Sequence, residues 1–188
     1  MRTVLHFLAT LALLAYGSVA HASSYQIDKA GQHAFITFKA SHLGYSYIIG
    51  HFEDFDGEFQ YDENAPQASE VNVVIQAKSL DSNHAERDKH LTGKEYFDAE
   101  QHPLITFSST GYEGAADAGQ LTGDLTIKGI TRTVTLNVSK IGQGDDPWGG
   151  YRAGFEGDVT LSAGDYDLPG WIGDVEVNLI VEGVRQND

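Results

Sequence analysis

Histidines and acids spaced four residues apart are the first candidates for chemistry in this sequence. Residues 83–91 read NHAERDKHL, in which His84 and Asp88, and likewise Glu86 and His90, stand at positions i and i+4. Side chains at this spacing share one face of a helix, so a metal site is one interpretation. A solvated helix face is the other, and it is favoured because no compact motif such as HExxH is present. We therefore expect no metal site.

Other catalytic signatures are missing from the sequence. No nucleophile elbow of the form GxSxG occurs, and the chain has no cysteine, which excludes thiol chemistry and cysteine–metal sites. The glycine-rich segment 142–150, GQGDDPWGG, precedes no helical pattern and holds two acids that would repel phosphate. We interpret it as a loop carrying Trp148, either solvated or lying as a flap near one end of the fold. We expect no catalytic residue and no cofactor.

The charge of the chain restricts its partners. It carries 12 Lys and Arg against 27 Asp and Glu, a formal net charge of −15. Such a surface repels nucleic acid and anionic membranes, and neither a basic patch nor a basic amphipathic helix is visible. We expect no nucleic-acid partner and no stable membrane insertion. A protein of this charge that handles lipid is more plausibly a soluble carrier than a surface binder.

The residues that must position any site alternate between apolar and polar with period two. The clearest example is residues 121–138, LTGDLTIKGITRTVTLNV, two alternating segments that meet at Lys128 and Gly129. In the first segment Leu125 and Ile127 fall on the apolar face, and period two is the signature of a β-strand. Glycine accepts the positive φ of a tight turn, so the two segments predict a β-hairpin.

Similar alternation recurs almost to the end of the chain. It is found at residues 36–40, 55–61, 71–77, 105–107, 155–161 and 175–181. With the two arms of the hairpin, this makes about eight strands. Many strands with turns at near-regular spacing indicate an all-β fold, either an antiparallel sandwich or a barrel. A barrel of about eight strands is either filled by its side chains or holds one elongated ligand, and periodicity does not distinguish the two.

One segment, residues 81–91, breaks the β pattern and predicts a single short polar helix outside the sheet. Asn83 followed three residues later by Glu86 resembles a capping box, and Gly93 supplies a stop.

The N-terminus predicts export. Arg2 is followed by an apolar run at residues 4–16, too short to span a bilayer, and by a cleavage site of the form Ala20-x-Ala22. We therefore predict a signal peptide at residues 1–22, cleaved after Ala22, and a periplasmic mature chain of residues 23–188. That length is typical of one domain with a substantial core.

Several motifs resemble the YceI-like family. They include NHAERDKHL at 83–91, YFD at 96–98, HP at 102–103, ITFSST at 105–110 and GxLTIxGIT at 123–131. Further matches are ID at 27–28, HAxIxF at 33–38, HLG at 42–44 and GxFxDFxG at 50–57, while residues 142–150 and 152–156 are similar to the prototype secreted member. The resemblance covers nearly all of the mature chain.

The resemblance implies a lipocalin-like extended antiparallel β-barrel whose apolar pore holds a polyprenyl chain or an isoprenoid quinone. It also implies a periplasmic location, a homodimer formed through an exposed sheet face, and a link to alkali or osmotic stress or to electron transport. In one place the sequence departs from the family. Members commonly carry a basic residue before an Asp-aromatic pair in the penultimate strand, whereas residues 162–167 read SAGDYD and lack that base. The headgroup preference implied by the family therefore does not transfer.

The expected ligand site is the apolar face of the strands, with His42 at one end. Alternation from residue 36 places His42 on this face, where a headgroup would stop; a hydrogen bond to a neighbouring loop is the plainer interpretation. The resemblance favours a lined pore over a filled one. The expected ligand-binding residues are Ile36, Phe38, His42, Phe55, Phe59, Val73, Ile75, Ile105, Phe107, Leu125, Ile127, Leu136, Phe155, Val159, Leu161, Val177 and Leu179.

Two other functions are alternatives to a carrier of a long isoprenoid lipid. One is an enzyme that acts on the bound isoprenoid or quinone, with His42 as its base. The other is a filled barrel that binds a protein partner in a stress response, which predicts a solid interior.

Overall fold

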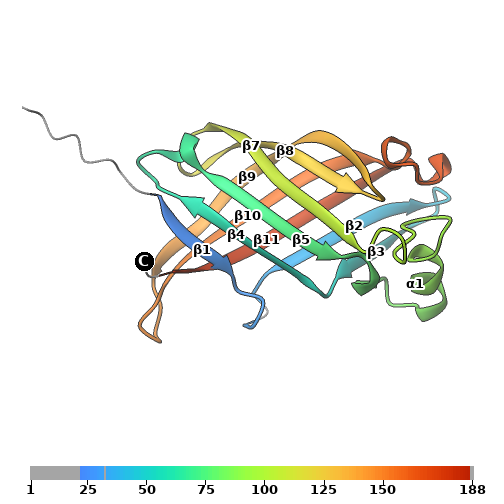
Figure 1. The fold of residues 1–188 in the computed structure, drawn as a ribbon, viewed down its shortest axis with the longest axis horizontal. Helices are drawn as coiled ribbons and strands as arrows, with labels where there is room; N and C mark the ends of the chain where they lie inside the picture. Colours follow the sequence, from blue (N-terminus) through green and yellow to red (C-terminus); the bar gives the residue numbers. More distant parts are fainter. Residues whose placement is uncertain (1–21, 32, 187–188) are drawn as a thin grey trace, which may run out of the picture.

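A computed structural model describes residues 22–31 and 33–186. The predicted signal peptide, apart from its last residue, lies outside the described residues. The described chain is an elongated all-β barrel with a single α-helix at one end (Figure 1). Among these residues, no helix has the length and apolar character needed to cross a bilayer.

Eight antiparallel strands close the barrel, which confirms the predicted fold class. In spatial order, each strand pairs with the next and the last pairs with the first. The strands are β1 (Ser23–Ile27), β4 (Phe55–Tyr61), β5 (Glu70–Gln76), β7 (Leu104–Gly114), β8 (Ala118–Ile127), β9 (Ile130–Asp145), β10 (Tyr151–Ser162) and β11 (Asp174–Arg185).

Three more strands extend the sheet at the end of the barrel that carries the helix. Strand β11 pairs with two strands on the same edge. Its last residues form the antiparallel ladder with β1, and its first half forms the ladder with β2 (Phe35–His42). Strand β2 then pairs with β3 (Ser46–Phe52), and β3 with the two-residue β6 (Leu80–Asp81). Short 3-10 helices fill the connections: η1 (Pro66–Ala68), η2 (Ala77–Ser79), η3 (Ala163–Tyr166) and η4 (Gly170–Ile172).

The hairpin predicted at residues 121–138 is β8 and β9. Its two turn residues, Lys128 and Gly129, have φ of 52° and 75°. Positive φ at both central residues defines the type I′ turn, whose twist matches that of paired strands. The cross-strand pair Leu121 and Leu136 lies on the same face, which is buried in the barrel.

The strand count needs one correction. Seven of the eight predicted strands belong to the closed ring, but residues 36–40 lie in β2, which extends the wall beyond that ring, and the eighth strand of the ring is β1. Strand β1 buries only Tyr25 and Ile27, too short an alternation to stand out. Strand β3 was also missed, because its exposed face carries Tyr47 and Ile49 and so hides the period.

The helix is shorter than predicted. α1 spans Ala85–Leu91, and its N-cap is His84 rather than Asn83. Asn83 has φ of 63°, and the His84 ring accepts a hydrogen bond from the backbone N–H of Arg87, at 3.2 Å. An imidazole nitrogen of His84 thus caps the helix N-terminus, the role that the sequence pattern assigned to the side chain of Asn83.

Candidate functional site

The interior of the barrel holds two adjoining cavities of about 180 and 480 Å³, here called cavity 1 and cavity 2. Both are walled almost entirely by apolar side chains. They meet at a ring of five shared residues: Ile36, Ile75, Leu125, Leu161 and Val177. The barrel is therefore lined rather than filled, and the space runs along its axis.

All seventeen residues expected to bind a ligand line this space; that they bind one stays a prediction. Along cavity 1 lie Ile36, Phe55, Phe59, Val73, Ile75, Phe107, Leu125, Leu136, Phe155, Val159, Leu161, Val177 and Leu179. The others, Phe38, His42, Ile105 and Ile127, lie along cavity 2. They share the wall because successive strand side chains point to opposite faces, so one apolar face becomes one interior surface.

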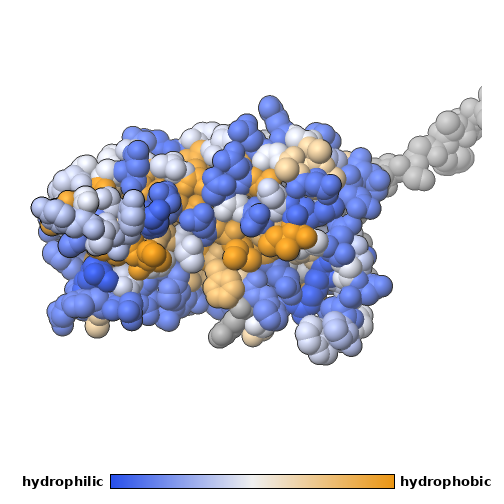
Figure 2. All heavy atoms as spheres, turned by 180° about the vertical axis from the view of Figure 1, so that it is seen from behind, coloured by the Kyte–Doolittle hydropathy of each residue, from blue (hydrophilic) through white to orange (hydrophobic). Residues whose placement is uncertain are grey.

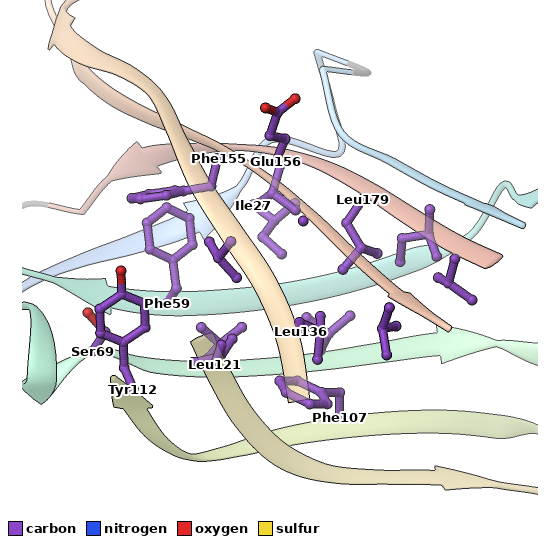
Figure 3. A pocket seen from close by; sticks show the side chains of 18 of the residues that line it. Ile27, Phe59, Ser69, Phe107, Tyr112, Leu121, Leu136, Phe155, Glu156 and Leu179 are labelled. Carbon is purple, nitrogen blue, oxygen red and sulfur yellow. The ribbon is translucent and has the colours of Figure 1, made fainter. Parts of the chain in front are cut away.

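Figure 3 shows how this wall is built in cavity 1. Phe59 and Phe155 face each other from β4 and β10, with ring centroids 5.6 Å apart in an edge-to-face arrangement. Leu121, Leu136 and Leu179 point into the same space from β8, β9 and β11, while the Glu156 carboxylate turns away from it. The side walls of the cavity thus present mainly hydrocarbon, a surface suited to an apolar chain.

Sequence reasoning missed the lining that comes from loops and from the helix. In cavity 2 these residues are Leu91, Tyr96, Phe97, Tyr166, Leu168 and Trp171. They lie on α1, on the turns after it and on the connection from β10 to β11, where no strand period exists to reveal a face. Ile48 and Phe52 were missed with the rest of β3.

The outer end of cavity 1 is closed by polar groups that are paired with one another. The Tyr61 hydroxyl donates to the Ala116 carbonyl at 3.1 Å, and the Tyr112 hydroxyl to that of Ala115 at 2.6 Å. The Lys140 ammonium lies 3.0 Å from a carboxylate oxygen of Asp117. The Asp117 carboxylate raises the pKa of Lys140, and burial raises the pKa of Tyr61. No polar group of this cluster is left needing a ligand.

The few polar side chains that line cavity 2 differ in kind from those at the outer end of cavity 1. Its lining has no Asp or Glu, although the chain has 27; its ionisable side chains are His42, Arg87, His90, Tyr96 and Tyr166. Tyr166 is only 2% exposed, and its hydroxyl has no hydrogen-bond partner among the described residues. Burial raises its pKa, so the phenol stays neutral. His42 is exposed and lies at the mouth of the cavity, at the end of β2, as expected.

The wall between β9 and β10 is partly unpaired. Their ladder ends at Asn137 and Asp158, although β9 begins seven residues earlier, at Ile130, and β10 runs on to Ser162. Side chains on both sides of this interval, including Val134 and Val159, still line cavity 1. Over this interval no backbone ladder joins the two strands, and η3 lies close to both of them.

Comparison with known proteins identifies the family. A family model described as a YceI-like domain matches residues 25–183. The chain belongs to the YceI-like family. A UPF0312 protein of Pseudomonas aeruginosa (strain LESB58) is 50% identical over 187 residues, covering 94% of this chain and 98% of that protein.

Two solved structures share the fold of this YceI-like chain. BcnA of Burkholderia cenocepacia superposes with a TM-score of 0.74 at 21% identity, covering 83% of this chain and 98% of that one. A polyisoprenoid binding domain from Saccharophagus degradans superposes with a TM-score of 0.65 at 15% identity, covering 87% and 99%. At these identities the likeness shows a common barrel.

The helix of this YceI-like chain does not assemble the metal site that its spacing allowed. The His84 ring caps the helix, and Asp88 accepts hydrogen bonds from the backbone and hydroxyl of Ser82. His90 packs edge-on against Tyr96, with ring centroids 5.1 Å apart. In the part of the chain that the structure describes, none of His84, Glu86, Asp88 and His90 belongs to a group of three close metal-ligating side chains.

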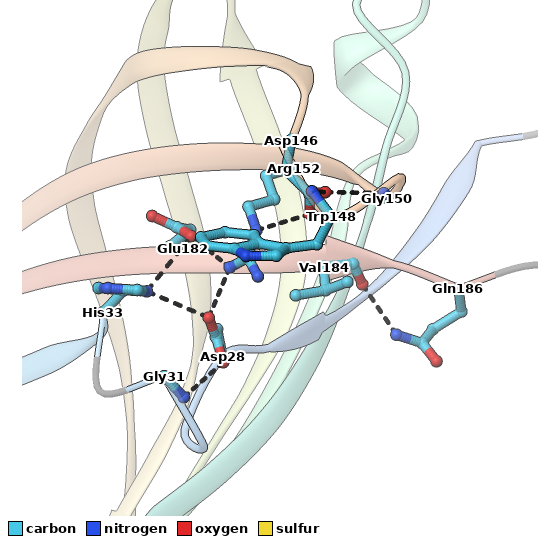
Figure 4. A network of polar contacts seen from close by, with 10 residues as sticks. All are labelled: Asp28, Gly31, His33, Asp146, Trp148, Gly150, Arg152, Glu182, Val184 and Gln186. Atoms are coloured by element: carbon cyan, nitrogen blue, oxygen red, sulfur yellow. Dashed lines mark hydrogen bonds and ion pairs between the residues drawn. The ribbon is translucent and has the colours of Figure 1, made fainter.

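A charged cluster lies on the outer face of the barrel wall beside cavity 1, where β10 and β11 meet the chain that follows β1 (Figure 4). The Arg152 guanidinium is bonded to Asp28 and Glu182 and lies 2.9 Å from an oxygen of Asp146. His33 also reaches Asp28, at 3.2 Å. Asp28, His33 and Glu182 have metal-like spacing, but Arg152 already occupies the two carboxylates. This arrangement is a structural clamp that joins β10 and β11 to the chain that follows β1.

The glycine-rich loop belongs to this clamp rather than to a flap over a cavity. Asp146 accepts hydrogen bonds from the backbone N–H groups of Trp148 and Gly150, at 2.9 and 2.7 Å. The Trp148 ring lies over the Arg152 guanidinium, 5.2 Å away, and lines neither cavity. Hydrogen bonds from the Gly150 backbone and from Arg152 lower the pKa of Asp146, and Arg152 lowers that of Asp28.

Proposed function

We propose that this protein is a periplasmic carrier that encloses a long-chain polyisoprenoid, or the tail of an isoprenoid quinone, in the two adjoining cavities. The observation that carries the proposal is the lined interior: a closed barrel whose axis is hollow and walled by hydrocarbon. The barrel is shared with the polyisoprenoid binding domain of Saccharophagus degradans, which supports this choice of ligand. The predicted signal peptide supports the compartment.

Apolar burial supplies enough driving force. Removing one CH₂ group from water contributes about 0.8 kcal/mol, so a five-carbon isoprenoid unit contributes on the order of 3–4 kcal/mol before entropy costs. A few enclosed units therefore give tight binding, and a longer tail is enclosed for solubility. The polar groups at the outer end of cavity 1 are already paired with one another, so none is free to bind a headgroup. We therefore place the end of the apolar tail in cavity 1 and the headgroup at the mouth of cavity 2.

The proposal is tested by blocking the cavity. Leu179 points into cavity 1, whereas the next residue, Ile180, lies on the opposite face of β11 and is 47% exposed. Leu179→Trp fills space in cavity 1 that the isoprenoid tail would occupy, so affinity for an isoprenoid quinone and for a polyprenyl alcohol should fall at least tenfold. Ile180→Trp adds the same ring outside the barrel and should leave both affinities unchanged.

Both variants are titrated after removal of bound lipid, with circular dichroism confirming that each is folded. Equal affinities of the two variants would show that the ligand does not enter cavity 1. No uptake by the unmodified protein would contradict the carrier function.

A further inference from the structure

Five exposed apolar side chains gather at the end of the barrel where cavity 2 opens. They are Leu43, Tyr45, Tyr47, Ile49 and Trp171, each between 62 and 86% exposed, and are called here the mouth patch. Four lie on the β2–β3 hairpin and one on η4, which packs against β2. Figure 1 shows this hairpin and the β10–β11 connection at the same end as α1. Figure 2 shows the molecule from behind the view of Figure 1, where apolar side chains also gather along the middle of the face and polar ones flank them.

The mouth patch is continuous with the interior. Leu43 and Trp171 are exposed, yet both also line cavity 2. On β3, the outward Tyr47 and Ile49 alternate with Ile48 and Phe52, which line the cavity. An apolar chain leaving cavity 2 therefore meets apolar surface outside it, so it can pass onto the patch without entering water.

The charge of this region differs from that of the rest of the chain. From Lys29 to Phe52 the sequence has no Asp or Glu, the longest such stretch after Asp28, in a chain with 27 acids. The lining of cavity 2 also lacks acids. The net charge of −15 repels an anionic surface, and α1 and the β10–β11 connection at this end carry acids such as Glu86 and Asp165, so the acid-free β2–β3 hairpin is the part that can approach a bilayer most closely.

We propose that the mouth patch docks transiently on the surface of a lipid bilayer, where cavity 2 loads or unloads its ligand; this rests on the carrier function proposed above. Tyr and Trp are the side chains that favour the boundary between water and lipid, since each joins an apolar ring to a polar group. A second copy of the chain is the other candidate occupant. A stable dimer needs about 800 Å² and 20–30 residues from each partner, far more than five side chains at a hairpin tip.

The two tryptophans of the chain allow a direct test, because Trp148 lies in the Arg152 cluster and Trp171 lies in the mouth patch. Trp148→Phe leaves Trp171 as the reporter, and Trp171→Phe leaves Trp148. Each variant is mixed with phosphatidylcholine vesicles carrying brominated acyl chains. We expect quenching and a blue shift for Trp171 and neither for Trp148. Equal quenching of both, or of neither, would overturn the proposal.

A matched pair of surface variants measures the contribution of the patch. Leu43→Ser with Tyr45→Ser removes two exposed side chains and should weaken vesicle partitioning roughly tenfold. Ile141→Ser removes an apolar side chain, 61% exposed, outside the mouth patch, and should change nothing. Analytical ultracentrifugation tests the other occupant. A wild-type dimer that is lost in the double variant, together with no binding of the wild type to vesicles, would assign the patch to a second copy instead.

The two proposals fail separately. Uptake of isoprenoid from solution without vesicle quenching would overturn the docking and leave the carrier function standing. Failure of the wild-type protein to take up any isoprenoid would overturn both.

Discussion

The two ends of the barrel are closed by different means. At the cavity 1 end, the hydroxyls of Tyr61 and Tyr112 donate to backbone carbonyls and Lys140 pairs with Asp117. On the outer face of the wall beside this cavity, Arg152 joins three carboxylates. At the cavity 2 end, loops cover the opening, and the buried Tyr166 hydroxyl lacks a partner among the described residues. An end held by satisfied polar pairs resists opening, whereas an end covered by loops opens at lower cost. We infer that ligand enters and leaves through cavity 2.

The largest expected effect is the loss of the Arg152 clamp. Arg152→Ala leaves Asp28, Asp146 and Glu182 facing one another without a cation. Removing the cation leaves these partly exposed carboxylates without their main hydrogen-bond donor, which costs about 1–3 kcal/mol. The free energy of unfolding, measured with urea, should fall by that amount. A loss below about 1 kcal/mol would mean that the clamp does not stabilise the junction of β10, β11 and the chain that follows β1.

The same cluster predicts a pH dependence. The folded pKa values of Asp28 and Asp146 lie below their ordinary value of 3.8, so the clamp stabilises the fold fully at neutral pH. This contribution is lost as the pH falls from about 4 through the folded pKa values of the two aspartates. The other ionisable groups that face them are Glu182, which contacts Arg152, and His33, which lies beside Asp28 and Glu182. Urea unfolding of the wild type and of Arg152→Ala should therefore converge below pH 4. A constant difference at all pH values would contradict the linkage.

A pair of smaller changes compares the two ends directly. Tyr61→Phe removes the hydroxyl that donates to Ala116 and should lower the free energy of unfolding by about 1 kcal/mol. Tyr166→Phe removes a buried hydroxyl without a partner and should raise it by up to about 1 kcal/mol. Thermal melting of lipid-free protein measures both. Equal destabilisation would show that Tyr166 has a partner in solution.

The smallest expected effect is that of His42→Ala. His42 lines the mouth of cavity 2 but is exposed, so it buries little apolar surface against a tail, and affinity for a polyprenyl tail should change less than twofold. The same variant addresses the enzyme alternative. If a bound isoprenoid or quinone is chemically altered during incubation, and His42→Ala abolishes that change, the protein is an enzyme and His42 its base.

The sequence was informative wherever one face of a strand is buried. The β8–β9 hairpin, its turn at Lys128 and Gly129, and the apolar wall all follow from period two. Strand β3 was not predicted, because its outer face carries the apolar side chains of the mouth patch and the sequence therefore does not alternate between apolar and polar residues. The Arg152 clamp escaped for another reason: its members are up to 154 residues apart, from Asp28 to Glu182, and only the closed barrel brings them together.

Loop residues define the functional end and were the hardest to foresee. Tyr166 and Trp171 lie in a connection whose composition indicates only turns, and their burial or exposure depends on β2 and α1 packing beside them. Conversely, residues 83–91 carried a spacing that allowed a metal, but the fold uses His84 as a cap and Asp88 as an acceptor. Spacing alone therefore did not determine chemistry.

The most direct measurement is mass spectrometry of the organic-solvent extract of protein purified from the periplasm. We expect a polyprenyl or isoprenoid quinone species close to one per protein, and its depletion in Leu179→Trp but not in Ile180→Trp. An empty extract, together with failure to take up added isoprenoid quinone, would contradict the carrier function and assign the hollow barrel another use.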